Sequence, residues 1–247
     1  MAARAAGRNL AEQVLSQISC QTTPAGEVAF ALKRLFYHLN LPHNDPRWSI
    51  ALAATQRRVP EMNPASASVA ATAISKLPPT NPEKLSLLRE VRNRALHSLL
   101  TEPNNVTSAD LSNFCTSFAI SGLLKNDEEL MTKLFDAAQS RMANFPDECT
   151  CNRAVGLASA LCKAESTNRR YVTNYLTKSA DTLATMVPEM TTREITTVCH
   201  AYAKATVRHK VLWGAIAKRL PYWQNELTGP DVANISQALA KVGIRDI

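Results

Sequence analysis

The segment 231–241, DVANISQALAK, aligns without gaps with four earlier segments of the chain. They are 194–204 (EITTVCHAYAK), 153–163 (RAVGLASALCK), 110–120 (DLSNFCTSFAI) and 66–76 (SASVAATAISK), and a fainter copy lies at 28–38 (VAFALKRLFYH). The last positions of consecutive copies are 37 to 44 residues apart. A period of that length is typical of proteins built from repeated helix pairs.

Each copy carries apolar residues at i, i+3 and i+7, which share one face of a helix and predict its buried side. The three columns are Ala67, Leu111, Ala154, Ile195, Val232; then Ala70, Phe114, Leu157, Val198, Ile235; then Ile74, Phe118, Leu161, Tyr202, Leu239. A column of small residues, Ala73, Ser117, Ala160, Ala201 and Ala238, allows neighbouring helices to approach closely. Cys115 and Cys199 stand in a further column of mostly small residues, so we interpret them as packing residues.

A second helix is expected after each copy, over 47–57, 83–100, 127–142, 169–186 and 210–222. Asp45-Pro46 and Asn81-Pro82 place an N-cap side chain before a first-turn proline, and Asn168 is expected to cap 169–186. Thr191 and Glu194 have the spacing of a capping box. The sequence therefore predicts an all-α protein, a right-handed α-solenoid of about five and a half helix-turn-helix repeats of 37 to 44 residues over 23–247.

Composition agrees with this interpretation and leaves the partner open. Apolar residues make up 45% of the chain, there are only 7 glycines, and most of the 13 prolines fall between apolar stretches. No run approaches the roughly 18 apolar residues of a membrane span, so no membrane contact is expected. The formal charge of +7 suits an RNA partner, and equally a mitochondrial or ribosomal environment without direct contact. The six cysteines lack zinc-site spacing, Cys149 and Cys151 being the one close pair.

The N-terminal segment, residues 1–22, carries Arg4 and Arg8 and no acidic residue before Glu12. Leu10, Val14, Leu15 and Ile18 then fall on one helical face. This composition is typical of a mitochondrial targeting sequence, which predicts location in the matrix. An ordinary first helix is the alternative.

The segments ITTVCHAYAK (195–204) and DVANISQALAKVG (231–243) share the pattern aliphatic-x-x-aliphatic-x-x-Ala-aromatic or Leu-Ala-Lys. This pattern resembles the heptatricopeptide and octotricopeptide repeats of the FAST-kinase-like and RAP-domain proteins of mitochondria and chloroplasts. The resemblance covers about residues 65 to 247 and fades toward the N-terminus. It implies work on organellar RNA: stabilisation or processing of transcripts, or a structural place in a mitochondrial ribosome. No RAP-type domain follows the repeats, which puts the nuclease-like activity of the wider family in doubt.

The face opposite the buried stripe is mostly polar and ends in a row of lysines. Its columns are Val69, Asn113, Gly156, Thr197, Asn234; Thr72, Thr116, Ser159, His200, Gln237; and Lys76, Ile120, Lys163, Lys204, Lys241. Amide, hydroxyl and imidazole groups can bond unpaired base edges, while lysines can follow phosphates. The predicted RNA-binding residues are Asn113, Thr116, Lys163, Thr197, His200, Lys204, Asn234, Gln237 and Lys241, with Arg169, Arg170, Arg208 and Lys210 adding phosphate contacts. The alternative is an ordinary solvated helix face.

The sequence thus predicts a helical repeat protein that contacts rRNA or an organellar transcript. The last copy begins at Gly229-Pro230-Asp231 and has no second helix, so its apolar end is expected to meet other proteins, a second copy of the chain or further polypeptide. A HEAT- or armadillo-like protein scaffold with no nucleic-acid contact is the alternative function. No catalytic motif occurs and the five histidines are dispersed, so we expect no enzyme activity, cofactor, metal or small-molecule substrate.

Overall fold

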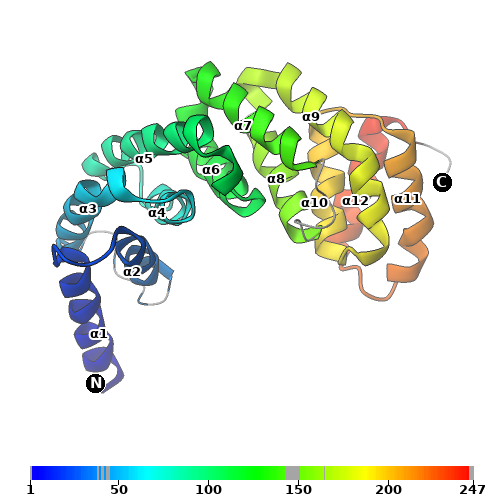
Figure 1. Ribbon diagram of the computed structural model, residues 1–247. Helices are drawn as coiled ribbons and strands as arrows, with labels where there is room; N and C mark the ends of the chain where they lie inside the picture. The colour runs from blue at the N-terminus through cyan, green and yellow to red at the C-terminus, as the bar shows by residue number, and fades with distance from the viewer. Residues whose placement is uncertain are drawn as a thin grey trace. The chain divides into compact units, whose positions relative to one another are not determined.

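The computed structural model describes the backbone of residues 2–37, 39, 42, 45–142, 151–163 and 165–244. Side chains are not described for 2–9, 125, 126, 142, 151–153, 157, 161, 163 and 165–168. The described residues form twelve α-helices, joined in places by short 3-10 turns, and contain no β-strand (Figure 1). The prediction of an all-α protein is confirmed. None of these helices combines the length and the apolar character needed to cross a bilayer.

The chain divides into two compact units, Met1–Leu123 and Leu124–Ile247, which the repeat pattern did not predict. In the N-terminal unit, α2, α4 and α6 pack in one row and α1, α3 and α5 in another (Figure 1). The helices are α1 (Ala2–Ser19), α2 (Ala25–Tyr37), α3 (Arg47–Arg58), α4 (Pro64–Ser75), α5 (Pro82–Thr101) and α6 (Ser108–Ile120), with 3-10 turns at Val59–Glu61 and Pro103–Asn105. A further 3-10 turn, Leu123–Asn126, spans the boundary between the two units.

The C-terminal unit has the same alternation. The repeated segments α8, α10 and α12 form one row, and the second helices α7, α9 and α11 form the other (Figure 1). The helices are α7 (Glu128–Met142), α8 (Cys151–Lys163), α9 (Glu165–Met186), α10 (Thr192–Lys204), α11 (Lys210–Arg219) and α12 (Gly229–Val242), with 3-10 turns at Val187–Glu189 and Leu220–Trp223. In both units, therefore, a helix packs on the helix two places further along the chain.

The predicted apolar stripe is the core of both units. The described members of the three columns are buried, except that Val232 is 48% exposed and Leu239 is half-buried. The small column is buried from Ala73 to Ala238, and Cys115 and Cys199 are buried as predicted. Leu157 and Leu161 lie outside the described side chains. Burial of so many apolar side chains at about 25 cal/mol per Å² is what holds these short helices together.

Side-chain caps mark the starts of α4, α5, α6, α10 and α12. The Asn81 side chain accepts hydrogen bonds from the N–H groups of Glu83 and Lys84. Thr191 and Glu194 form the predicted capping box at the start of α10. The structure adds two capping boxes that were not predicted, Thr107 with Asp110 at α6 and Thr228 with Asp231 at α12.

Three predicted boundaries were wrong by a few residues. Pro46, not Asp45, is the N-cap of α3, although Asp45 accepts a hydrogen bond from the Arg47 N–H at 3.0 Å. Asn168 lies within α9, which begins at Glu165, because no proline or glycine interrupts the helix before it. Helix α11 ends at Arg219, since Pro221 has no N–H to continue an α-helical ladder.

The N-terminal segment folds as α1, which packs against α2 and α3. Ala11, Val14, Leu15 and Ile18 are buried, whereas Leu10 is partly exposed. The predicted apolar face of this segment therefore belongs to the core of the N-terminal unit. Its predicted role in targeting stays a prediction.

Candidate nucleic-acid interface

The clearest polar site is a groove between α10 and α12 in the C-terminal unit, with a volume of about 120 Å³. It is lined by His200, Ala203 and Lys204 from α10 and by Asn234, Gln237, Ala238 and Lys241 from α12. We call it the α10–α12 groove. All five of its polar lining residues are predicted RNA-binding residues, so the structure brings these five together.

Helix spacing explains how the groove forms. His200 and Lys204 are one turn apart on α10, and Asn234, Gln237 and Lys241 follow one face of α12. The two helices pack side by side, and the buried Ala203 and Ala238 leave room between the longer side chains. The Thr196 hydroxyl, 3.2 Å from Asp231 Oδ1, adds a hydrogen bond between the helices. The groove is therefore a product of the same packing that forms the core.

The groove is cationic and rich in hydrogen-bonding groups. No carboxylate is among its lining residues, and His200, Lys204 and Lys241 are exposed. Asn234 and Gln237 each offer both donors and acceptors, while the lysines offer only donors. Such a set can hold a polar, negatively charged chain.

Lys204 has a structural bond that the sequence did not reveal. Its Nζ donates to the Cys162 carbonyl oxygen at 2.8 Å. This carbonyl belongs to the last turn of α8, where backbone oxygens lack helical partners and a cation is favourable. Lys204 therefore joins the end of α8 to α10 while its exposed side chain also lines the groove.

Other predicted residues lie near the groove or elsewhere in the same unit. Thr197 is half-buried, and its hydroxyl donates to the Arg193 carbonyl at 2.8 Å. Arg169 donates to the Thr206 hydroxyl at 3.1 Å, in the turn after α10. Arg170 lines a separate cavity of about 620 Å³ between α7 and α9, together with Glu128. These two arginines are therefore not part of the α10–α12 groove.

Arg208 and Lys210 also lie outside the groove, because they line a larger cavity between α11 and α12. That cavity includes Lys218, which the sequence analysis missed. The reason is that the residue columns compared only the first helices of the repeats, whereas Lys218 lies on a second helix. The side chain of Lys163 lies outside the described residues.

Asn113 and Thr116 belong to α6 of the N-terminal unit and so are not brought into the groove. Asn113 donates to the Ser68 hydroxyl at 3.4 Å, which points its amide toward α4. Thr116 is half-buried. The structure thus brings five of the predicted RNA-binding residues together in the α10–α12 groove. The other predicted residues that the structure describes lie outside it.

Two comparisons bear on this site. Neither the protein-family models nor the curated proteins include a match to the chain. Among the described residues, no cluster of three or more His, Cys, Asp or Glu side chains is placed to hold a metal ion.

Proposed function

We propose that this protein is a non-catalytic, right-handed α-solenoid that binds single-stranded RNA through the α10–α12 groove. The observation that carries the proposal is the convergence of His200, Lys204, Asn234, Gln237 and Lys241 on one groove without a carboxylate. The alternating packing of helices within each unit supports a solenoid. The RNA is an rRNA or an organellar transcript, and the protein is a structural part of a mitochondrial ribosome or RNA-processing assembly.

The chemistry of the groove suits RNA better than duplex DNA. Unpaired bases expose their edges, and the amides of Asn234 and Gln237 can bond those edges. The ammonium groups of Lys204 and Lys241 can contact the phosphates on either side. The formal charge of +7 adds a long-range attraction for a polyanion.

The organellar setting rests on two features of the sequence. The segments 195–204 and 231–243 resemble the tricopeptide-type repeats of organellar RNA proteins. Arg4 and Arg8 precede the first acidic residue, as in mitochondrial targeting sequences. In this setting the polar face contacts RNA, while the apolar end of the C-terminal unit contacts proteins.

A protein scaffold without nucleic acid is the second candidate. The observation in its favour is Val232, which is 48% exposed although the same column is buried in the other described repeats. An apolar surface of this kind suits a protein partner. A pure scaffold would bind with little dependence on salt, whereas contacts to phosphates weaken steeply as salt rises.

Fluorescence anisotropy with a labelled single-stranded oligoribonucleotide tests the RNA proposal. We expect binding whose logarithm falls linearly with the logarithm of the salt concentration. Gln237→Ala with Lys241→Glu should lower the affinity by about tenfold or more, since a phosphate contact becomes a repulsion. Lys178→Glu, with the same change of charge on an exposed α9 residue, is the control and should have a small effect.

Absence of RNA binding, or an equal loss in the groove variant and in Lys178→Glu, would refute the groove as an RNA site. Ultraviolet crosslinking of the tagged protein in isolated mitochondria is the second arm. Recovery of rRNA or of a defined transcript identifies the RNA and the compartment together. Protein partners recovered without RNA would favour the scaffold.

A further inference from the structure

A second groove, between α11 and α12, differs in chemistry from the polar groove. It contains a cavity of about 600 Å³ lined by Arg208, Lys210, Trp213, Gly214, Ala217 and Lys218 and by Val242, Gly243 and Ile244 at the end of α12. We call it the α11–α12 groove. Trp213 and Val242 are buried and form an apolar floor, while the three cations are exposed. This volume is in the range of specific binding sites.

The floor of the groove is fixed. The Trp213 indole donates its Nε1–H to the Val207 carbonyl at 3.1 Å, so its polar atom is already bonded. Gly214 has no side chain, and a Cβ built there would meet no atom within 4 Å, which leaves one wall of the groove open. The groove can therefore receive apolar side chains without leaving a buried polar group unpaired.

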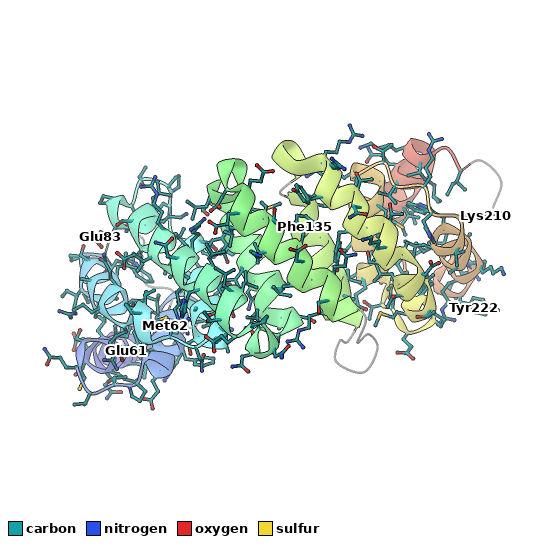
Figure 2. The ribbon with its side chains drawn as sticks, turned by 45° about the horizontal axis from the view of Figure 1, so that its top comes forward. Glu61, Met62, Glu83, Phe135, Lys210 and Tyr222 are labelled. Carbon is teal, nitrogen blue, oxygen red and sulfur yellow. The ribbon has the colours of Figure 1, made fainter. Side chains whose placement is uncertain are left out.

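Apolar exposure continues along both helices. On α11, Val211 is 58% exposed. Tyr222, in the 3-10 turn after the helix, is 72% exposed. Figure 2 labels Tyr222 near α11. On α12, Val232 is 48% exposed, whereas its counterparts Leu111 and Ile195 are fully buried. Ile195 belongs to α10, which has packed neighbours on both sides, namely α8 and α12. Among the described residues, no helix takes the corresponding place beside α12, so Val232 stays exposed there.

The charges around this surface specify the kind of helix that fits. Arg208, Lys210 and Lys218 form no ion pair with any described carboxylate, and none of the described residues that line the cavity is acidic. The Arg208 guanidinium lies 3.5 Å from the position that a Cβ of Gly243 would take, so it is held along the end of α12. A symmetric contact with a second copy of the chain would bring the same three cations against this face. An acidic partner is attracted instead.

We propose that the α11–α12 groove binds an acidic amphipathic helix of another protein. The apolar face of that helix packs over Trp213 and Val242, and its carboxylates face Arg208, Lys210 and Lys218. Amphipathic helices recognise grooves in this way through apolar residues at i, i+3, i+4 and i+7. The inference rests on that part of the proposed function which assigns protein contacts to the end of the C-terminal unit. It is independent of RNA binding in the α10–α12 groove.

The test uses the full chain and a small set of labelled peptides of about 18 residues, or five helical turns. The peptides share leucine and isoleucine at i, i+3, i+4 and i+7, and they carry either glutamate or lysine at the other positions. We expect the glutamate peptides to bind and the lysine peptides to bind at least about tenfold more weakly. The double variant Arg208→Glu/Lys218→Glu should reverse this preference. Val211→Ser/Val232→Ser should weaken both series.

A matched control is Lys178→Glu/Arg193→Glu, which makes the same change of charge at exposed positions of α9 and α10. It should leave the preference for glutamate peptides intact, and thermal unfolding shows whether each variant is folded. Failure of every peptide to bind, equal binding of both series, or an unchanged preference in the Arg208/Lys218 variant would overturn the proposal. Loss of oligoribonucleotide binding in that variant, with no peptide binding to the parent chain, would assign the cations to RNA instead. None of these outcomes depends on Gln237 or Lys241.

Discussion

Asp110 of α6 accepts a hydrogen bond from the Ser68 hydroxyl of α4 at 2.7 Å, and both residues are buried. The same carboxylate closes the capping box on Thr107. In the C-terminal unit, Asp231 of α12 has the same two relationships, with Thr196 of α10 at 3.2 Å and with the Thr228 capping box. Aspartate is the first position of the repeated segment, and the hydroxyl residue is the third position of the copy before it. One side chain thus starts a helix and fixes it to its neighbour.

Asp110→Ala should lower the free energy of unfolding by about 2–4 kcal/mol, because it removes a helix cap and leaves the buried Ser68 hydroxyl with fewer partners. Urea denaturation followed by circular dichroism measures this change. Asp231→Ala is the comparison, and it should cost less because Asp231 is more exposed. A smaller effect of Asp110→Ala than of Asp231→Ala would show that the buried hydrogen bond adds nothing to the cap.

The sequence predicts the core well because the core is periodic. Apolar residues that recur at i, i+3 and i+7 in six segments identify Phe114, Val198 and their counterparts as buried, whatever the exact placement of the helices. The prediction that Asn168 caps a helix was wrong because local sequence only favours a capping position. The residues before it can extend the helix at little cost in free energy. Element boundaries depend on such small differences.

The candidate site was only partly predictable for a different reason. The columns identify polar positions on each helix, so they correctly brought His200 and Gln237 into one set. They carry no information on contacts between one helix and the next, or on the second helices of the repeats. Lys218 was therefore missed, and the bond from Lys204 to the Cys162 carbonyl could not be foreseen. Division of the chain into two units likewise has no signal in the repeat.

The exposed cysteine should react with a thiol reagent, and the buried cysteines should not. Cys20 is exposed, and a hydrogen bond with the Thr22 side chain lowers the pKa of its thiol. Burial raises the pKa of Cys115 and of Cys199 to about 12, so neither forms the reactive thiolate near neutral pH. Iodoacetamide labelling followed by mass spectrometry should modify Cys20 first, and Cys115, Cys199 and the likewise buried Cys162 only in denaturant. Cys149→Ser/Cys151→Ser removes two further thiols from the assay. Rapid labelling of Cys115 in the native protein would contradict its burial.

Tyr202 should make stability fall at alkaline pH. Its hydroxyl donates to the Leu176 carbonyl at 2.8 Å and lies 3.0 Å from the Ser179 hydroxyl, which joins α10 to α9. Burial raises the pKa of Tyr202, so the folded state keeps the proton at pH values where the unfolded state releases it. Its contribution is therefore complete below about pH 10 and is lost progressively as the pH rises further.

Tyr202→Phe should remove that part of the alkaline dependence and lower stability by about 1–2 kcal/mol at neutral pH, because two buried partners lose a hydrogen bond. Urea denaturation at a series of pH values measures both effects. Tyr222→Phe is the matched control, because Tyr222 is largely exposed. An identical alkaline limb in Tyr202→Phe and in the parent chain would exclude this role for Tyr202.

Glu102 should contribute to the acid limb of stability. Hydrogen bonds from Asn105, at 3.2 Å, and from Arg94, at 2.8 Å, lower the pKa of its carboxyl group. Since the folded pKa lies below the ordinary value, this stabilisation is present above about pH 4.5 and disappears as the pH falls through the folded pKa. Glu102→Gln should flatten this limb in acid denaturation curves. Glu61→Gln, at a more exposed carboxylate of the same unit, should change the limb less.

Variants of Lys204 and Lys241 should distinguish a contribution to protein stability from a contribution to RNA binding in the α10–α12 groove. The Lys204 ammonium donates to the Cys162 carbonyl, whereas the exposed Lys241 forms no hydrogen bond of this kind with the described residues. Lys204→Gln should therefore lower both the free energy of unfolding and the affinity for single-stranded RNA. Lys241→Gln should reduce RNA affinity and the slope of its salt dependence by about one unit, while stability stays within about 0.5 kcal/mol of the parent. Denaturation and anisotropy on the same preparations measure the two effects.

Equal losses of stability in the two variants would mean that the hydrogen bond from Lys204 to Cys162 contributes nothing to stability. Unchanged RNA affinity in both variants would mean that neither lysine belongs to the RNA-binding site.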